Sequence, residues 1–165
     1  MADVANSRLM NLDTGIFKKD ACIVLVKTDW NAAIIDELEK GAINILRQNG
    51  ITDIIRVTVP GAFELPFAVK KIWEARDLGS KPDAFITFGV VIRGDTPHFD
   101  YVCRAVTDGV LQLNLTLPVP TIFGVLTVDN QQQALERIGG LHGHKGEEAA
   151  ITALKMTGLL QQLPG

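Results

Sequence analysis

Short apolar runs alternate along this chain with longer segments in which apolar residues recur every three or four positions. Runs of the first kind, bounded by turn residues, are typical of strands buried in a parallel sheet, and segments of the second kind are typical of helices with one buried face. Strands are predicted at residues 21–27, 54–59, 84–92 and 120–126. Helices are predicted at residues 32–48, 65–75, 97–117, 129–140 and 147–160.

This regular alternation of strands and helices predicts an α/β fold. We expect a three-layer αβα sandwich around a four-stranded parallel sheet, with right-handed crossovers and the flavodoxin-like strand order 2-1-3-4. Residues 21–165 are expected to form a single domain. Residues 1–20 are polar and patternless, so we expect either an irregular arm or a segment that pairs with a neighbouring subunit.

Composition narrows the class of partner. Lys and Arg number 16 and Asp and Glu 19, for a net charge of −3, and no basic block stands out. A nucleic-acid partner is therefore not expected, and the aliphatic runs are too short for a membrane span. The chain opens without a signal-peptide pattern, and Cys22 and Cys103 both lie in apolar segments. We expect reduced core thiols in a cytoplasmic protein.

The strongest local pattern is the segment Gly94-Asp95-Thr96-Pro97-His98. Thr96 is a good helix N-cap and Pro97 suits the first helical position, so the backbone N–H groups before the helix could bind an anion. His98 would lie in the first turn, where the helix dipole disfavours the imidazolium and leaves a neutral ring for proton transfer. An ordinary capped helix explains the same pattern equally well.

Two further candidates follow predicted strands. Trp30 comes directly after the first strand, beside Asn31, where an aromatic ring can stack on a flat heterocycle or simply pack. Phe63 and Glu64 follow a Pro-Gly turn after the second strand. A carboxylate there could accept hydrogen bonds from sugar hydroxyls or cap the next helix.

A glycine-rich loop near the C-terminus carries the remaining candidates. Arg137 and Lys145 could pair with a phosphate, although the loop is not a P-loop because glycine follows Lys145. His142 and His144 form an H-x-H pair without Cys or carboxylate partners at ligand spacing. Solvated loop histidines are the favoured interpretation, and no metal site is predicted.

Five motifs occur together in this chain: VPGAFELPFAVKK, GVVIRGDTPHFDYV, PVPTIFGVLTVDN, ALERIGG and HKGEEAA. In this order and spacing the sequence resembles the lumazine synthases, from about residue 21 to residue 160. The resemblance implies condensation of 5-amino-6-(D-ribitylamino)uracil with 3,4-dihydroxy-2-butanone 4-phosphate. The product is 6,7-dimethyl-8-ribityllumazine, an intermediate of riboflavin biosynthesis, and phosphate and water are released. No metal or organic cofactor is implied.

The resemblance also assigns roles to particular positions. His98 matches the proton-transfer residue, and Trp30 stands where the family often has a stacking Phe. The residues implied to bind the pyrimidine and its ribityl chain, besides Trp30, are Asn31, Ala62, Phe63, Glu64, Val90, Val91 and Ile92. Phosphate binding is implied for Gly94, Asp95, Thr96 and Arg137, with Asp95 acting through its backbone N–H. Phe123 matches an aromatic residue from the adjacent subunit, and Lys145 a basic residue that lines the same pocket.

The family's pocket lies between subunits, so the resemblance implies a homopentamer, twelve of which can form a 60-subunit shell. Riboflavin synthase is a candidate partner besides the small-molecule substrates. Two alternatives use the same scaffold. One is a non-catalytic flavin- or lumazine-binding protein, which would need no phosphate site. The other is a flavodoxin-type electron carrier, which would need a hydroxyl-rich loop in place of Thr28-Asp29-Trp30-Asn31.

Overall fold

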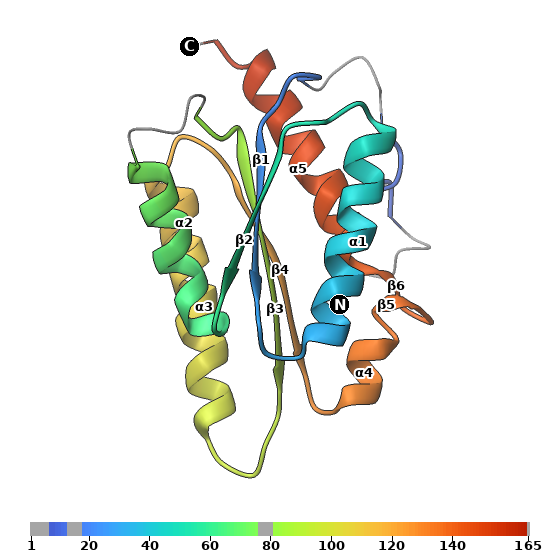
Figure 1. The fold of residues 1–165 in the computed structure, drawn as a ribbon, viewed down its shortest axis with the longest axis vertical. Helices are drawn as coiled ribbons and strands as arrows, with labels where there is room; N and C mark the ends of the chain where they lie inside the picture. The colour runs from blue at the N-terminus through green and yellow to red at the C-terminus, as the bar shows by residue number, and fades with distance from the viewer. Residues whose placement is uncertain (1–6, 13–17, 76–80, 165) are drawn as a thin grey trace.

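A computed structural model describes residues 7–12, 18–75 and 81–164 of the chain. Its centre is a four-stranded parallel sheet with the strand order β2-β1-β3-β4. The strands are β1 (Ile23–Thr28), β2 (Ile54–Val59), β3 (Ala84–Ile92) and β4 (Thr121–Val128). Helices α1 (Ala32–Gln48) and α5 (Lys145–Gln162) cover one face, and α2 (Leu65–Glu74) and α3 (His98–Thr116) cover the other (Figure 1). The predicted α/β sandwich and strand order are confirmed.

The core lies on both faces of the sheet because β1 and β3 alternate their side chains between the two helix layers. Ile23 and Leu25 pack into the cluster formed with α1 and α5. Val24 and Val26 pack into the cluster formed with α2 and α3. All four side chains have no exposed surface. A strand buried on both faces reads as a continuous apolar run, which is why β1 and β3 stand out in the sequence.

The segment after β4 differs from the prediction. The next helix, α4, is capped by Asn130, whose side chain accepts a hydrogen bond from the Gln133 N–H, so it begins two residues later than predicted. Helix α4 (Gln131–Leu135) ends well before the expected glycine pair. The chain then forms an antiparallel hairpin of β5 (Ile138–Gly140) and β6 (Gly143–His144). Gly139, predicted at the helix end, instead lies in the hairpin with a positive φ of 110°, and Gly143 in the facing strand has a φ of 74°.

Two predictions about individual side chains, Thr96 and His144, are also wrong. The Thr96 side chain does not cap α3: the helix begins at His98 after Pro97, with no side-chain capping hydrogen bond. His144 is not a solvated loop histidine. Its Nδ1 accepts a 3.4 Å hydrogen bond from the Glu147 N–H and so caps α5, and a Cβ at Gly41 would overlap its ring.

Only parts of the predicted N-terminal arm can be described, because residues 1–6 and 13–17 lie outside the described ranges. Leu12 packs against the α1–α5 side of the core. The Arg8 carbonyl accepts a hydrogen bond from Lys155 on α5, and Lys18 pairs with Asp83 at 3.0 Å. No helix in the described part of the chain is long and apolar enough to cross a membrane.

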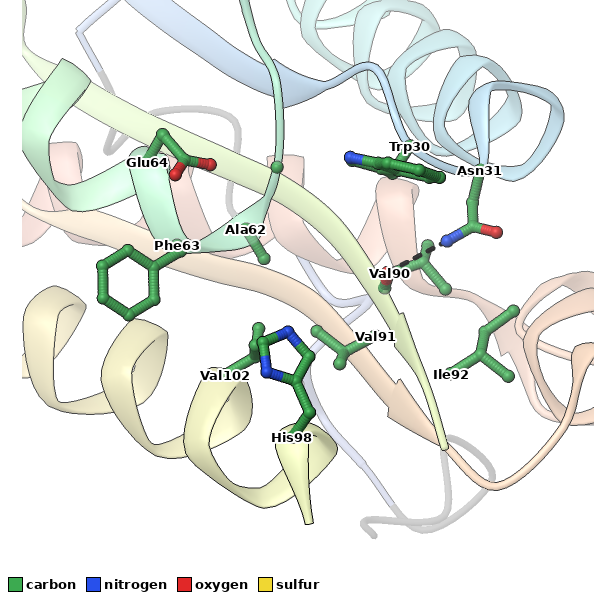
Figure 2. A pocket seen from close by; sticks show the side chains of 11 residues that line it. Trp30, Asn31, Ala62, Phe63, Glu64, Val90, Val91, Ile92, His98 and Val102 are labelled. Carbon is green, nitrogen blue, oxygen red and sulfur yellow. Dashed lines mark hydrogen bonds between the residues drawn. The ribbon is translucent and has the colours of Figure 1, made fainter. Parts of the chain in front are cut away.

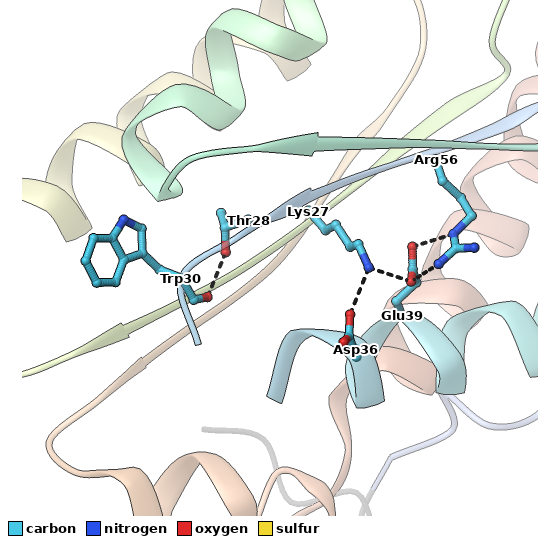
Figure 3. A network of polar contacts seen from close by, with 6 residues as sticks. All are labelled: Lys27, Thr28, Trp30, Asp36, Glu39 and Arg56. Atoms are coloured by element: carbon cyan, nitrogen blue, oxygen red, sulfur yellow. Dashed lines mark hydrogen bonds and ion pairs between the residues drawn. The ribbon is translucent and has the colours of Figure 1, made fainter. Parts of the chain in front are cut away.

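A buried carboxylate joins β1, β2 and α1. Glu39 on α1 is 4% exposed at its side chain and accepts hydrogen bonds from Lys27 on β1 and Arg56 on β2, at 2.8–2.9 Å for Lys27 Nζ and Arg56 Nε (Figure 3). Lys27 also pairs with Asp36 at 2.8 Å. Burial acts to raise the pKa of Glu39, but hydrogen bonds from Arg56 and Lys27 outweigh it, so the pKa lies below its ordinary value.

Replacing Glu39 with Gln should lower the free energy of unfolding by about 2 kcal/mol, because Lys27 and Arg56 lose a largely buried counter-charge. The folded pKa lies below the ordinary value of 4.5, so this stabilisation is complete above that value and is lost as the pH falls through the folded pKa. Urea unfolding of both proteins between pH 7 and pH 3 should show the two stabilities converging at acid pH. Glu37→Gln, which removes an exposed partner of Lys40, is the control and should change stability by less than about 0.5 kcal/mol. A constant gap across this range would contradict the assignment.

Candidate active site

A pocket of about 530 Å³ lies where β1, β2 and β3 end, between these strand ends and the start of α3. Its walls come from three segments of chain that are far apart in sequence (Figure 2). The lining residues are Trp30, Asn31, Gly61, Ala62, Phe63, Glu64, Val90, Val91, Ile92, His98 and Val102. Parallel strands place their carboxyl ends at one edge of the sheet, which is where open α/β folds bind ligands.

One wall is formed by the turn between β1 and α1. Asn31 has left-handed backbone angles, φ 61° and ψ 40°, a conformation that asparagine tolerates better than most residues. Its side-chain Nδ2 donates a 3.1 Å hydrogen bond to the Val90 carbonyl on β3. The Trp30 N–H donates to the Pro60 carbonyl at 3.4 Å. The turn is thus hydrogen-bonded to β3 and to the residue that follows β2, while Trp30 is 73% exposed at the pocket mouth.

The opposite wall is a single turn of 3-10 helix, η2 (Ala62–Glu64). Ala62 is buried, whereas Phe63 and Glu64 are exposed. Gly61 keeps this wall close to Trp30: a Cβ there would lie 3.1 Å from Glu64 Oε2 and 3.5 Å from the Trp30 ring. The Glu64 carboxylate and the Trp30 indole therefore face the same small volume, with an acceptor next to a flat apolar surface.

His98 lines the pocket from the first turn of α3, and Val102 follows one helical turn later. Before it, residues 93–97 connect β3 to α3. Gly94, Asp95 and Thr96 are exposed, and in the described part of the chain their backbone N–H groups donate no hydrogen bond to the protein. Free N–H groups in front of a helix are suited to an anion.

Six residues that the resemblance assigns to the site do not line this pocket. Three of them are the turn residues Gly94, Asp95 and Thr96 beside it, and the other three, Phe123, Arg137 and Lys145, lie on other elements. Phe123 lies on β4 and is 42% exposed. Arg137 follows α4, and its Nη1 donates to the Gln133 carbonyl at 2.6 Å. Lys145 begins α5 and pairs with Glu148 at 2.7 Å, both side chains being largely buried.

Sequence reasoning did not select two of the lining residues. Gly61 is predicted as part of the turn that follows the second strand, and in the structure its place beside Trp30 shapes the pocket. Val102 could have been found from helical spacing, because it lies four positions after His98 on the same face of α3. Among residues 7–12, 18–75 and 81–164, no cluster of three or more His, Cys, Asp or Glu side chains could hold a metal ion.

Comparison with known proteins agrees with the resemblance. A sequence model of the family described as 6,7-dimethyl-8-ribityllumazine synthase matches residues 20–161. A protein of that name from Porphyromonas gingivalis is 50% identical over 143 residues, covering 86% of each chain. Another, from Parabacteroides distasonis, is 48% identical over 136 residues, covering 81% of this chain and 82% of its own. A third, from Flavobacterium psychrophilum, is 43% identical over 162 residues, covering 96% of this chain and 84% of its own.

The left-handed Asn31 can be tested with a pair of substitutions. Asn31→Gly keeps access to the positive φ but removes the hydrogen bond to Val90, so we expect a loss of about 1 kcal/mol in unfolding free energy. Asn31→Ala removes the hydrogen bond and also strains the backbone, which should cost roughly 1 kcal/mol more. Chemical denaturation of the wild-type protein and the two variants measures the contribution of the hydrogen bond and the cost of the backbone strain. Equal stabilities for the two variants would show that the left-handed backbone conformation does not restrict which residue position 31 can hold.

Proposed function

The chain belongs to the 6,7-dimethyl-8-ribityllumazine synthase family, and from that premise we propose how its pocket performs the family's reaction. The protein is a transferase of riboflavin biosynthesis. It condenses 5-amino-6-(D-ribitylamino)uracil with 3,4-dihydroxy-2-butanone 4-phosphate to give 6,7-dimethyl-8-ribityllumazine, phosphate and water. The observation that carries our site assignment is the convergence of Trp30, Glu64 and His98, from three different segments, on one pocket.

In our proposal, the pyrimidine ring stacks on Trp30, and the backbone groups of Val90, Val91 and Ile92 read its edge. Glu64 accepts hydrogen bonds from the ribityl hydroxyls, and Asn31, Ala62 and Phe63 complete this half of the site. Holding two reactants together in a fixed geometry replaces a collision in solution with an effectively intramolecular step, which is the main source of acceleration here. His98 moves protons during imine formation, phosphate elimination and ring closure.

The phosphate of the second substrate is proposed to bind the free N–H groups at Gly94, Asp95 and Thr96. Arg137 is proposed to complete that site. Since Arg137, Phe123 and Lys145 lie outside the pocket of their own chain, we propose that a neighbouring subunit supplies them. A ring of subunits that each lend residues to the next gives closed heterologous contacts.

We therefore propose a cytoplasmic homopentamer of a single domain, residues 21–165, with residues 1–20 either an irregular arm or a segment that pairs with a neighbouring subunit. Twelve pentamers forming a 60-subunit shell, and delivery of product to riboflavin synthase, are further parts of this proposal. The short connection between Arg137 and Lys145, residues 138–144, is compatible with the shell.

The reaction can be tested directly with the purified protein and both substrates. Lumazine absorbance and phosphate release should rise together above the spontaneous rate, whereas a non-catalytic flavin binder would give neither. His98→Gln keeps a polar side chain but cannot shuttle a proton, so kcat should fall by ~10²–10⁴-fold. His142→Ala, at the exposed hairpin, is the matched control and should keep wild-type kcat. Unchanged kcat in His98→Gln would remove His98 from the mechanism.

Shared sites make a quantitative prediction for mixed oligomers. Trp30→Ala and Arg137→Ala proteins should each be inactive or nearly so. After joint dissociation and reassembly in equal amounts, random assortment gives about one pocket in four an intact Trp30 and an intact Arg137 from its neighbour. Specific activity should return to about a quarter of the wild-type value, again by random assortment of the two chains. No recovery, when labelled subunits are seen to exchange, would place both residues in a single subunit's site.

A further inference from the structure

Arg93 is the first residue after β3, and its backbone continues the sheet. Its N–H donates a 2.9 Å hydrogen bond to the Val128 carbonyl, one step beyond the last residue of β3. The residue thus begins the connection to α3 from a fixed point. Arg93 does not line the pocket, although it stands directly before the turn Gly94–Thr96.

The Arg93 side chain makes three contacts that reach two other elements. Its Nε donates to Asp129 Oδ1 at 3.0 Å, at the end of β4. Its Nη1 lies 3.4 Å from Asp100 Oδ1, and its guanidinium carbon lies 4.1 Å from the centroid of the Phe99 ring, both in the first turn of α3. A planar guanidinium can make such directed hydrogen bonds and stack on an aromatic ring at once, which a lysine cannot.

These contacts bracket the functional part of the loop. Gly94, Asp95 and Thr96 lie between the backbone of Arg93 and the residues of α3 that its side chain contacts, and His98 directly precedes Phe99. The turn itself is exposed, with no N–H donated to the protein in the described ranges. Its geometry therefore depends on how its two ends are held, and Arg93 contacts both ends.

The charge of Arg93 is already compensated. The hydrogen bond to Asp129 is the main cause that raises the pKa of the guanidinium above its ordinary value, with Asp100 contributing. To bind a phosphate directly, the side chain would have to leave two carboxylates and the Phe99 ring. Each exposed ion pair is weak alone, but together the pairs hold the Arg93 guanidinium in one position. The guanidinium is therefore not a free cation available to a phosphate.

We propose that Arg93 is a positioning residue for the phosphate turn and for His98, acting through Asp129, Asp100 and Phe99 rather than as a phosphate ligand. This inference rests on the proposed function, because it takes the turn as the place where the substrate phosphate binds. It predicts that losing Arg93 weakens the use of the phosphate-bearing substrate and leaves the pyrimidine side of the pocket, around Trp30, unaffected.

The first test compares Arg93→Gln with the wild-type enzyme in steady-state kinetics with both substrates. We expect the KM for the butanone phosphate, and the inhibition constant for inorganic phosphate, to rise about tenfold, while the KM for the pyrimidine changes by less than about twofold. Arg104→Gln removes an arginine that pairs with Asp108 on the exposed face of α3 and is the matched control. Light scattering and thermal unfolding confirm that all variants assemble and fold.

A second pair of variants separates a positioning residue from a ligand. Asp129→Glu keeps the negative charge but moves the carboxylate away from its 3.0 Å contact with Arg93, so phosphate binding by an arginine that is itself the ligand would be little changed. If Arg93 positions the turn, the inhibition constant for phosphate rises instead. Arg93→Lys keeps the charge but not the directed contacts, so we expect it to behave like Arg93→Gln.

The outcomes are distinguishable. Unchanged phosphate and substrate constants in Arg93→Gln, or an unchanged inhibition constant for phosphate in Asp129→Glu, would overturn the positioning role while leaving the proposed function intact. Equal increases in both substrate KM values would show a general structural effect and would also overturn it. A wild-type protein that forms no lumazine above the spontaneous rate would instead contradict the proposed function itself.

Discussion

The structure depends on one constraint, the burial of β1 and β3 on both faces at the centre of a parallel sheet. Because the strands are parallel and β1 and β3 pack against a helix layer on either side, every connection runs back along one face of the sheet to the amino end of the next strand. The carboxyl ends of all four strands therefore meet at one edge. Trp30, Gly61, Arg93 and Asp129 each follow one of those ends, so the packing of the core determines which residues can form a site.

Packing alone does not set the shape of the site, because turns between strands and helices lack the repeated hydrogen bonds of either. In this chain, polar contacts join neighbouring turns at the edge. Asn31 donates to Val90 from the first turn to the third strand, and the Asp29 N–H donates to the Val59 carbonyl from the first strand to the second. Arg93 makes the corresponding link to Asp129. Side chains held this way before substrate arrives keep their geometry, which is what catalysis by positioning requires.

The sequence predicted those parts of the fold that follow from burial. Helix α1 and strands β2 and β3 have the predicted bounds, and the strand order is confirmed, because continuous apolar runs and one-sided helices leave little choice of register. The prediction for the segment after α4 was wrong. Its glycines suit a helix end and a hairpin equally well, and only the φ values decide between the two structures. The predicted Thr96 cap of α3 was wrong for a related reason. A Thr-Pro pair is compatible with capping, but His98 begins the helix without a side-chain cap.

The sequence pattern predicted only some of the residues that line the pocket. Local reasoning found Trp30, Glu64 and His98, and their convergence needed the three-dimensional arrangement. Assigning Phe123, Arg137 and Lys145 to the same site rested on the resemblance, because no periodicity in one chain indicates which residues a neighbouring subunit supplies. Their positions outside the pocket are what a site completed by a second subunit requires.

The charges around the phosphate turn explain why such completion is useful. Three aspartates, Asp95, Asp100 and Asp129, lie on or beside the turn, and Arg93 is already paired with two of them. The subunit's own side chains therefore leave this region negative, which opposes a phosphate dianion. Backbone N–H groups can orient the anion but carry no net charge to offset that repulsion. In the proposed site that charge comes from a cation outside the loop, and the proposed contribution of Arg137 from a neighbouring subunit would require the oligomer to form. On this argument, catalytic competence and assembly are coupled by electrostatics at one turn.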